Sequence, residues 1–264
     1  MSSARGPART ARSAIALVVF IASSLAWAAD EALPKAEIVL DHYIEVTGGK
    51  EAYQKRKTEI STGTFEIPAS GIKGTLTRYD ADPDKSYAVV DIEGVGKIES
   101  GTGDGLAWER SLISGPRVLS GEEKAQALRE NTFNAELNWR KIYSKTETVG
   151  TETVDGEECY KLVLTPKEGR PETMYYQKSS GLVVKMNTTL VSTMGELPVE
   201  ATMGDYKEFG GVLIAARITQ KAAGTEVTRT IQTMKVNEEI PAGRFDLPSD
   251  IRALVDKAAA PAKK

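Results

Sequence analysis

The chain has 264 residues, of which 34 are Lys or Arg and 37 are Asp or Glu, and its formal net charge is −3. No basic cluster carries interleaved aromatic residues, so we predict no nucleic-acid partner. Cys159 is the only cysteine and His42 the only histidine, which excludes an intramolecular disulfide and a zinc site built from several Cys or His ligands. We predict a protein that is not an enzyme, with no catalytic residue, metal or cofactor; a hydrolase that uses carboxylates ranks lowest among the alternatives.

Residues 1–28 have the pattern of a cleaved secretory signal. A basic start precedes an apolar run over 14–25, and Ala26-Trp27-Ala28 supplies the small residues of a cleavage site. The run is too short for a comfortable membrane span, although an uncleaved N-terminal anchor is the alternative. No cysteine lies near the site, which excludes a lipid-modified N-terminus. We expect an exported, soluble mature chain that begins at Ala29 and has no transmembrane span.

A first helix is predicted over 34–47, because apolar residues recur there at spacings of three and four. These residues are Ala36, Val39, Leu40, Tyr43 and Val46. Gly48 and Gly49 end the helix, and a brief helical piece is expected over 50–56. His42 lies on the first helix, where we expect it to be exposed.

From residue 58 the pattern changes to an alternation with a period of two, which is typical of half-buried strands. Short turn sequences separate five candidate strands, which lie at 58–67, 72–80, 86–93, 97–102 and 106–110. Such tight connections predict antiparallel neighbours, because a parallel crossover needs a dozen or more residues.

Residues 120–144 interrupt the strand pattern and predict a pair of helices. Ser120 followed by Glu123 has the form of a capping box, and Asn134 is suited to cap the second helix. Strand patterns then resume with seven further candidates, at 146–154, 159–165, 172–178, 182–193, 199–209, 212–221 and 225–236. Cys159 is expected to be a small buried apolar residue in a strand; a reactive thiol is the alternative.

About a dozen antiparallel strands predict a mainly β (α+β) fold. We expect a large curved antiparallel sheet or half-open β-barrel, with an N-terminal helix and a central helical insert covering it. The whole is predicted to be a single domain over 29–257, followed by a disordered tail over 258–264.

A curved sheet with an apolar concave face must cover that face or fill it with a ligand. The two helical regions are the available covers, and large apolar residues gather in and beside the central insert. The candidate ligand-binding residues are Trp108, Leu112, Phe133, Leu137, Trp139 and Tyr143. Packing in the core is the alternative for each of them, and a lid over a lipid-sized cavity is the sharper hypothesis.

Several short segments share an order along the chain with one known family. In the first half they are Gly74-x-Leu76, Pro83-Asp84-Lys85 and Gly103-Asp104-Gly105-Leu106-Ala107-Trp108. In the second half they are Tyr160-Lys161-Leu162-Val163-Leu164-Thr165-Pro166 and Ala242-Gly243-Arg244-Phe245-Asp246-Leu247-Pro248. Together these segments resemble the LolA/LolB-like lipoprotein-sorting carriers of the Gram-negative periplasm.

The resemblance implies a half-open β-barrel capped by helices, with an apolar cavity for acyl chains. Asp82 stands where the soluble carrier has an Arg that is implicated in ligand release, so handover of lipoproteins is not implied by this position. The absence of a lipobox excludes the membrane-anchored receptor form. We therefore expect a periplasmic carrier or binding protein for lipid or lipoprotein acyl chains. The alternative is a non-enzymatic envelope sensor or protein-interaction module with the same fold and a protein partner in the envelope.

Overall fold

The computed structural model describes Met1, residues 32–192 and residues 195–259. One compact unit begins at Leu33, and every helix and strand named below lies in it. Apart from Met1, the predicted signal over 1–28 lies outside the described residues.

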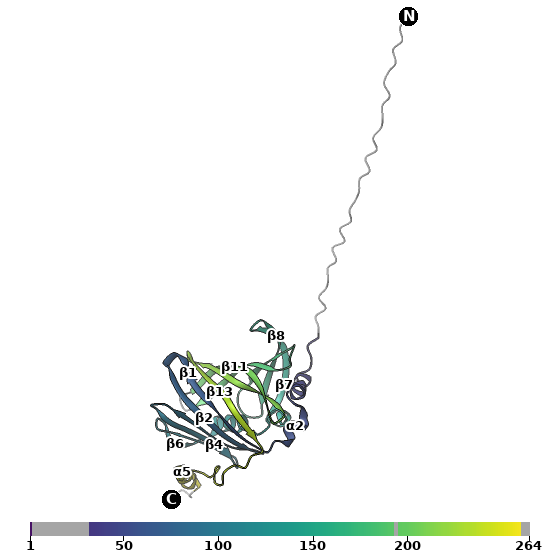
Figure 1. The fold of residues 1–264 in the computed structure, drawn as a ribbon. Helices are drawn as coiled ribbons and strands as arrows, with labels where there is room; N and C mark the ends of the chain where they lie inside the picture. Colours follow the sequence, from purple (N-terminus) through teal and green to yellow (C-terminus); the bar gives the residue numbers. More distant parts are fainter. Residues whose placement is uncertain (2–31, 193–194, 260–264) are drawn as a thin grey trace. The chain divides into compact units, whose positions relative to one another are not determined.

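Thirteen antiparallel strands form one sheet in the described part of the chain. Figure 1 shows how its strands and the helices are arranged. The first six are β1 (Thr58–Ile67), β2 (Ile72–Ala81), β3 (Lys85–Ile92), β4 (Gly96–Gly103), β5 (Leu106–Ser111) and β6 (Gly115–Val118). The other seven are β7 (Tyr143–Val154), β8 (Glu157–Pro166), β9 (Glu172–Gln177), β10 (Val183–Ser192), β11 (Gly195–Phe209), β12 (Val212–Ala222) and β13 (Thr225–Val236).

The sheet consists of two meanders that are joined by their innermost strands. Strands β1 to β6 follow one another outward on one side, strands β13 to β7 do so on the other, and β1 pairs with β13. Strands β6 and β7 are therefore the two edges, and the sheet is not closed. The chain crosses from one edge to the other through α3 (Gly121–Glu130) and α4 (Trp139–Ile142), which form the predicted central insert.

The contacts of α3 show how strongly the sheet curves. Helix α3 touches both β5 and β10, which are separated in the sheet by β4, β3, β2, β1, β13, β12 and β11. In a flat sheet these two strands would lie roughly 38 Å apart, at about 4.8 Å per neighbour. A ten-residue helix is only about 15 Å long. The sheet must therefore curl around α3, and the face that α3 touches is the concave one.

Helices α1 (Ala36–Val46) and α2 (Gly49–Lys55) pack against the β8, β9 and β12 part of this sheet. Their junction needs a glycine at position 48, where φ is +135° and a Cβ would overlap the backbone carbonyl of Gly211. The close approach lets the amide of Leu213 donate to the carbonyl of Thr47 at 2.8 Å. The Thr47 hydroxyl, fully buried, pairs with the hydroxyl of Tyr53 at 2.8 Å.

The C-terminal segment covers the outer face of the first meander. Helix α5 (Ser249–Ala259) contacts β6 and buries Ile251 completely. Before it, the guanidinium of Arg244 lies over the rings of Tyr79 and Tyr87, at 4.5 and 5.4 Å from their centroids.

The predicted fold class is confirmed, and so is the helix pair between the two sets of strands. The predicted capping box is wrong, because the Ser120 side chain makes no capping bond and Glu123 instead pairs with Arg117 of β6. Asn134 does not cap α4, which begins after Asn138. Strand β6 and helix α5 were not predicted from the sequence.

Helix α5 includes residues 258 and 259 of the tail that we expected to be disordered. The remainder of that tail, residues 260–264, lies outside the described residues. Within the described residues, none of the helices has the length and apolar character needed to cross a membrane.

Candidate functional site

The register of the strands identifies the side chains on the concave face. Leu162 of β8 is fully buried beneath α1 and so marks this side. Residues paired across antiparallel strands share a face, and the pairing leads from Leu162 through Met174 and Met186 to Ala201 of β11. Met203 lies two positions further along β11 on the same side. It pairs with Ile218 of β12, and the pairing continues from Ile218 through β13 to Phe65 of β1.

Six apolar residues lie on this side, four of them near the centre of the sheet and two as a pair across β10 and β11, and together we call them the apolar concave surface. They are Phe65, Leu76, Leu190, Leu197, Ile218 and Ile231. Leu190 is 43% exposed and the other five are half-buried, whereas Leu162 and Val212 beneath α1 and α2 are fully buried. Adjacent apolar side chains that remain partly exposed are typical of a binding surface.

Helix α3 is fixed to both meanders by polar side chains. On the β6 side, Arg117 donates to Glu123 at 3.0 Å. On the β10 side, the amide of Gln126 donates to the carbonyl of Thr189 at 3.3 Å and accepts from the amide of Val191 at 3.1 Å. The pairing of β10 with β9 ends at Asn187, so the carbonyl of Thr189 and the amide of Val191 have no partner in β9. The side chain of Gln126 takes the place of that partner and satisfies both groups.

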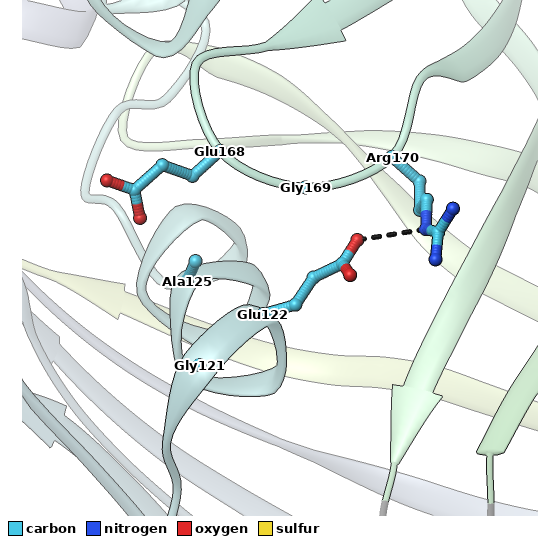
Figure 2. Close-up of a pocket in the computed structure, with 6 residues that line it drawn as sticks. All are labelled: Gly121, Glu122, Ala125, Glu168, Gly169 and Arg170. Carbon is cyan, nitrogen blue, oxygen red and sulfur yellow. Dashed lines mark ion pairs between the residues drawn. The ribbon is translucent and has the colours of Figure 1, made fainter.

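An open depression of about 500 Å³ lies where α3 meets the loop between β8 and β9. Figure 2 shows Glu122 and Ala125 of α3 facing Glu168, Gly169 and Arg170 of this loop. Arg170 pairs with Glu122 at 3.1 Å. The depression is lined by charged side chains and open to solvent, so it suits an ion-pair contact between insert and loop better than an acyl chain.

A buried carboxylate ties the insert to β9. Glu172, only 8% exposed in its side chain, accepts from the hydroxyl of Tyr143 and lies 3.7 Å from Arg129 of α3. Burial raises the pKa of Glu172, although the Tyr143 hydroxyl and the charge of Arg129 oppose the rise. This group therefore joins β7, β9 and α3 through one carboxylate.

The concave face also carries charged residues that sequence reasoning missed. Arg78 donates through Nε to both carboxylate oxygens of Asp80, at 3.0 and 2.7 Å. On the neighbouring strand Glu59 pairs with the buried Arg56. Burial raises the pKa of Glu59 to about 7. A charged residue in a strand pattern is typical of a solvent-facing position, so only the register across strands could have placed these groups inside.

The structure brings together three of the six predicted ligand-binding residues. Trp139 lies in the core beneath α1, with Leu137 and Tyr143 packed against it. The indole of Trp139 donates to Asp41 at 3.1 Å. These three positions belong to the packing of the insert, and their contact with a ligand stays a prediction.

The other three residues lie apart. Phe133 is buried where the insert meets the β2–β3 turn, and its amide donates to the carbonyl of Pro83 at 3.1 Å. Trp108 pairs with Gly101 across the strands and contacts Tyr87, which places it on the outer face. Leu112 is 83% exposed at the tip of the β5–β6 hairpin. Trp108 and Leu112 are therefore absent from the apolar concave surface.

The described residues contain no group of three or more His, Cys, Asp or Glu that could hold a metal ion. Cys159 is fully buried, and burial raises the pKa of its thiol, which fits the expected structural role. His42 is exposed on α1 and lies 3.6 Å from Glu45. Asp82 pairs with Lys57 at 2.8 Å on the surface.

No model of a known protein family matches the sequence. No curated protein matches it either. Solved structures, by contrast, show a clear similarity of fold. A LolA superfamily protein from Nitrosomonas europaea superposes with a TM-score of 0.55 at 14% identity, over 81% of this chain and 99% of that chain. The chain has the fold of the LolA superfamily.

Two further structures agree with this LolA-like fold. A DUF1329 family protein from Desulfovibrio piger has a TM-score of 0.55 at 14% identity, over 81% of this chain and 98% of that chain. A domain assigned to outer membrane lipoprotein sorting, from Vibrio parahaemolyticus, has a TM-score of 0.50 at 12% identity, over 78% and 97% respectively. At such low identities the similarity establishes the fold.

Proposed function

We propose that this protein is an exported carrier or binding protein that holds the acyl chain of a lipid or lipoprotein against its apolar concave surface. The observation that carries the proposal is the row of partly exposed apolar side chains on the concave face of a sheet whose edges do not pair. The LolA-like fold of the solved relatives supports it.

Apolar burial supplies the binding free energy in this proposal. Each CH₂ group removed from water contributes about 0.8 kcal/mol, so an acyl chain that buries only part of its length gains useful affinity. The proposal includes cleavage after Ala28 and a periplasmic location, since the pattern of residues 1–28 predicts a secretory signal.

The test uses the mature chain, Ala29 to Lys264, purified from a periplasmic extract without detergent. Native mass spectrometry and an organic extract would reveal a co-purified lipid or acylated peptide, and titration with a fluorescent C12 fatty acid would give its affinity. We expect a stoichiometric adduct and saturable binding of the fatty acid. A clean apo mass without uptake would contradict the carrier function and favour the protein-interaction module.

Two Leu→Glu variants separate the concave surface from the rest of the molecule. Leu190→Glu introduces a charge at a position that is already 43% exposed, so the fold should tolerate it. We expect it to weaken fatty-acid binding at least tenfold, because a carboxylate beside the alkyl chain must be desolvated. Leu112→Glu is the matched control at the β5–β6 tip, and its affinity should remain within twofold of wild type. Equal losses in both variants would contradict the site.

A further inference from the structure

Two arginines lie on the concave face close to the centre of the sheet. Arg78 of β2 pairs with Ser61 of β1, and Arg229 of β13 pairs with Phe65 of the same strand. Between these two positions β1 has Gly63, which presents no side chain. Both arginines therefore lie on the concave face, one on each side of β1, and Leu76 and Ile231 flank Gly63 between them as part of the apolar concave surface.

The guanidinium of Arg229 has no counterion. Within the residues that the structure describes, its side chain makes no hydrogen bond and no ion pair, and the residue is exposed to solvent. Burial by the surrounding protein nevertheless lowers its pKa, and the positive charge of Arg78 lowers it further, while Glu130 opposes the change. A cation that solvent reaches but protein surrounds is typical of a concave site, and an anion placed there would be attracted by a positive charge that no ion pair neutralises.

Arg78 offers further donors toward the same region. Its Nε is engaged by Asp80, but its two terminal nitrogens have no hydrogen-bond partner in the described part of the chain. The side chain is 34% exposed. Burial lowers the pKa of Arg78, but the charge and hydrogen bond of Asp80, together with the charges of Glu59 and Glu130, raise it overall. Two guanidinium groups thus present free N–H donors, which suit the oxygens of a phosphate or carboxylate.

The acidic groups around the arginines leave this charge only partly balanced. Asp80 is committed to Arg78 and Glu59 to Arg56. Glu130, at the last position of α3, interacts electrostatically with both Arg78 and Arg229. Its carboxylate accepts from Gln126 at 2.9 Å, and it forms no ion pair with either arginine among the described contacts. An acidic residue is unfavourable at a helix C-terminus, so attraction to the two arginines gives a reason for its position.

We propose that Arg78 and Arg229 bind the anionic headgroup, a phosphate or carboxylate, of a single-headed amphiphile whose alkyl chain lies on the apolar concave surface. This inference rests on the proposed function and deepens it, because it selects anionic amphiphiles over neutral ones. Phe65 and Ile218 are the partners of Arg229 on the neighbouring strands, so an alkyl chain would leave the charged site directly onto apolar side chains.

The experiment compares three probes on the mature chain by isothermal titration below the critical micelle concentrations. Monododecyl phosphate has the charge and a C12 chain, 1-monolaurin has a C12 chain without the charge, and inorganic phosphate has the charge without the chain. For wild type we expect monododecyl phosphate to bind at least tenfold more tightly than monolaurin, and inorganic phosphate to bind far more weakly than either.

The variants assign this preference to the two arginines. Arg229→Gln changes a side chain without a partner, so its fold should be retained, and it should reduce the preference for the phosphate to threefold or less. Arg78→Gln should act in the same direction, and Glu130→Gln should increase the affinity for monododecyl phosphate. Arg217→Gln is the matched control, since Arg217 lies on the outer face and pairs with Asp205 at 2.7 Å; it should leave the preference unchanged.

Each contrary result points to a different failure. If monolaurin and monododecyl phosphate bind wild type equally well, the anion site is refuted while the acyl-chain function stands. If inorganic phosphate binds as tightly as monododecyl phosphate, a free-anion site replaces the amphiphile site. If neither C12 probe binds, the proposed function itself is refuted.

Discussion

At the scale of single residues, Glu59 shows how the concave face changes the chemistry of an ordinary side chain. It lies between Arg56, its ion-pair partner, and Asp80, its neighbour across the strands. Burial raises its pKa from 4.5 to about 7, with a further contribution from Asp80 and an opposing one from Arg56. The carboxyl group is thus more easily protonated in the folded protein than in the unfolded chain.

The raised pKa predicts a specific pH dependence of stability. Between pH 4.5 and about pH 7 the folded state holds a proton at Glu59 that the unfolded state has released, so stability falls as pH rises through this window. The stabilisation is fully present below pH 4.5 and is lost above about pH 7, with a size on the order of 1–3 kcal/mol.

Urea unfolding of wild type and Glu59→Gln at pH 5 and pH 8 measures this contribution. The wild type should lose more stability between the two pH values than the variant does. Glu66→Gln, on the opposite face of the same strand, is the control and should follow the wild type. Parallel losses in wild type and Glu59→Gln would contradict the assignment to this residue.

At the scale of elements, the strands that the sequence predicted best are those with both alternation and turn signals. The bounds 58–67 and 225–236 were predicted for β1 and β13 and are confirmed. Strand β6 has only four residues and contains Pro116, so its pattern is too short to recognise. Helix α5 follows Pro248 and runs into an Ala-rich end, and its one fully buried residue, Ile251, gives no periodic signal by itself.

The candidate site could be predicted only in part, for a reason that lies in the register. Alternation within one strand tells which residues share a face, and the helical insert was a sound choice as a cover. The face that is concave, however, depends on pairings between strands far apart in the sequence, such as β1 with β13. The sequence therefore could not show that the candidate residue Trp108 lies on the outer face, and Arg229 was overlooked because a strand arginine is usually solvated.

The packing of helix α5, which was not predicted from the sequence, leads to a prediction about stability. Ile251→Ala should destabilise the protein by about 2–4 kcal/mol, because it leaves a cavity where α5 packs against the outer face of the first meander. Leu254→Ala, on the same helix at a position 36% exposed, should cost less than about 1 kcal/mol. Thermal and urea unfolding check both values. A loss of similar size in the two variants would contradict the docking of α5 through Ile251.

At the scale of the whole molecule, the insert connects the two edge strands, β6 and β7, of the open sheet in the part of the chain that the structure describes. On the β6 side an ion pair between Glu123 and Arg117 holds the insert. On the β10 side the side-chain amide of Gln126 makes two hydrogen bonds to the backbone of the strand. The rest of the sheet is held by continuous strand pairing from β6 to β7. We therefore expect an acyl chain to reach the apolar concave surface where α3 separates from β10, because only the hydrogen bonds of Gln126 to β10 must break there, whereas entry between two strands must break a continuous ladder.

Gln126→Ala tests this order of opening. The change leaves the carbonyl of Thr189 and the amide of Val191 without their partner, and an unmade buried hydrogen bond costs about 1–3 kcal/mol. Hydrogen exchange of α3 amides should accelerate by roughly tenfold or more, because a tenfold change in an opening equilibrium corresponds to about 1.4 kcal/mol. The amides of β1 and β13 should keep their protection, and a fluorescent C12 fatty acid should dissociate faster.

Gln232→Ala, at an exposed position of β13, is the matched control. Equal acceleration in α3 and in the central strands would mean that the insert opens only when the entire sheet unfolds, and entry between α3 and β10 would then be wrong.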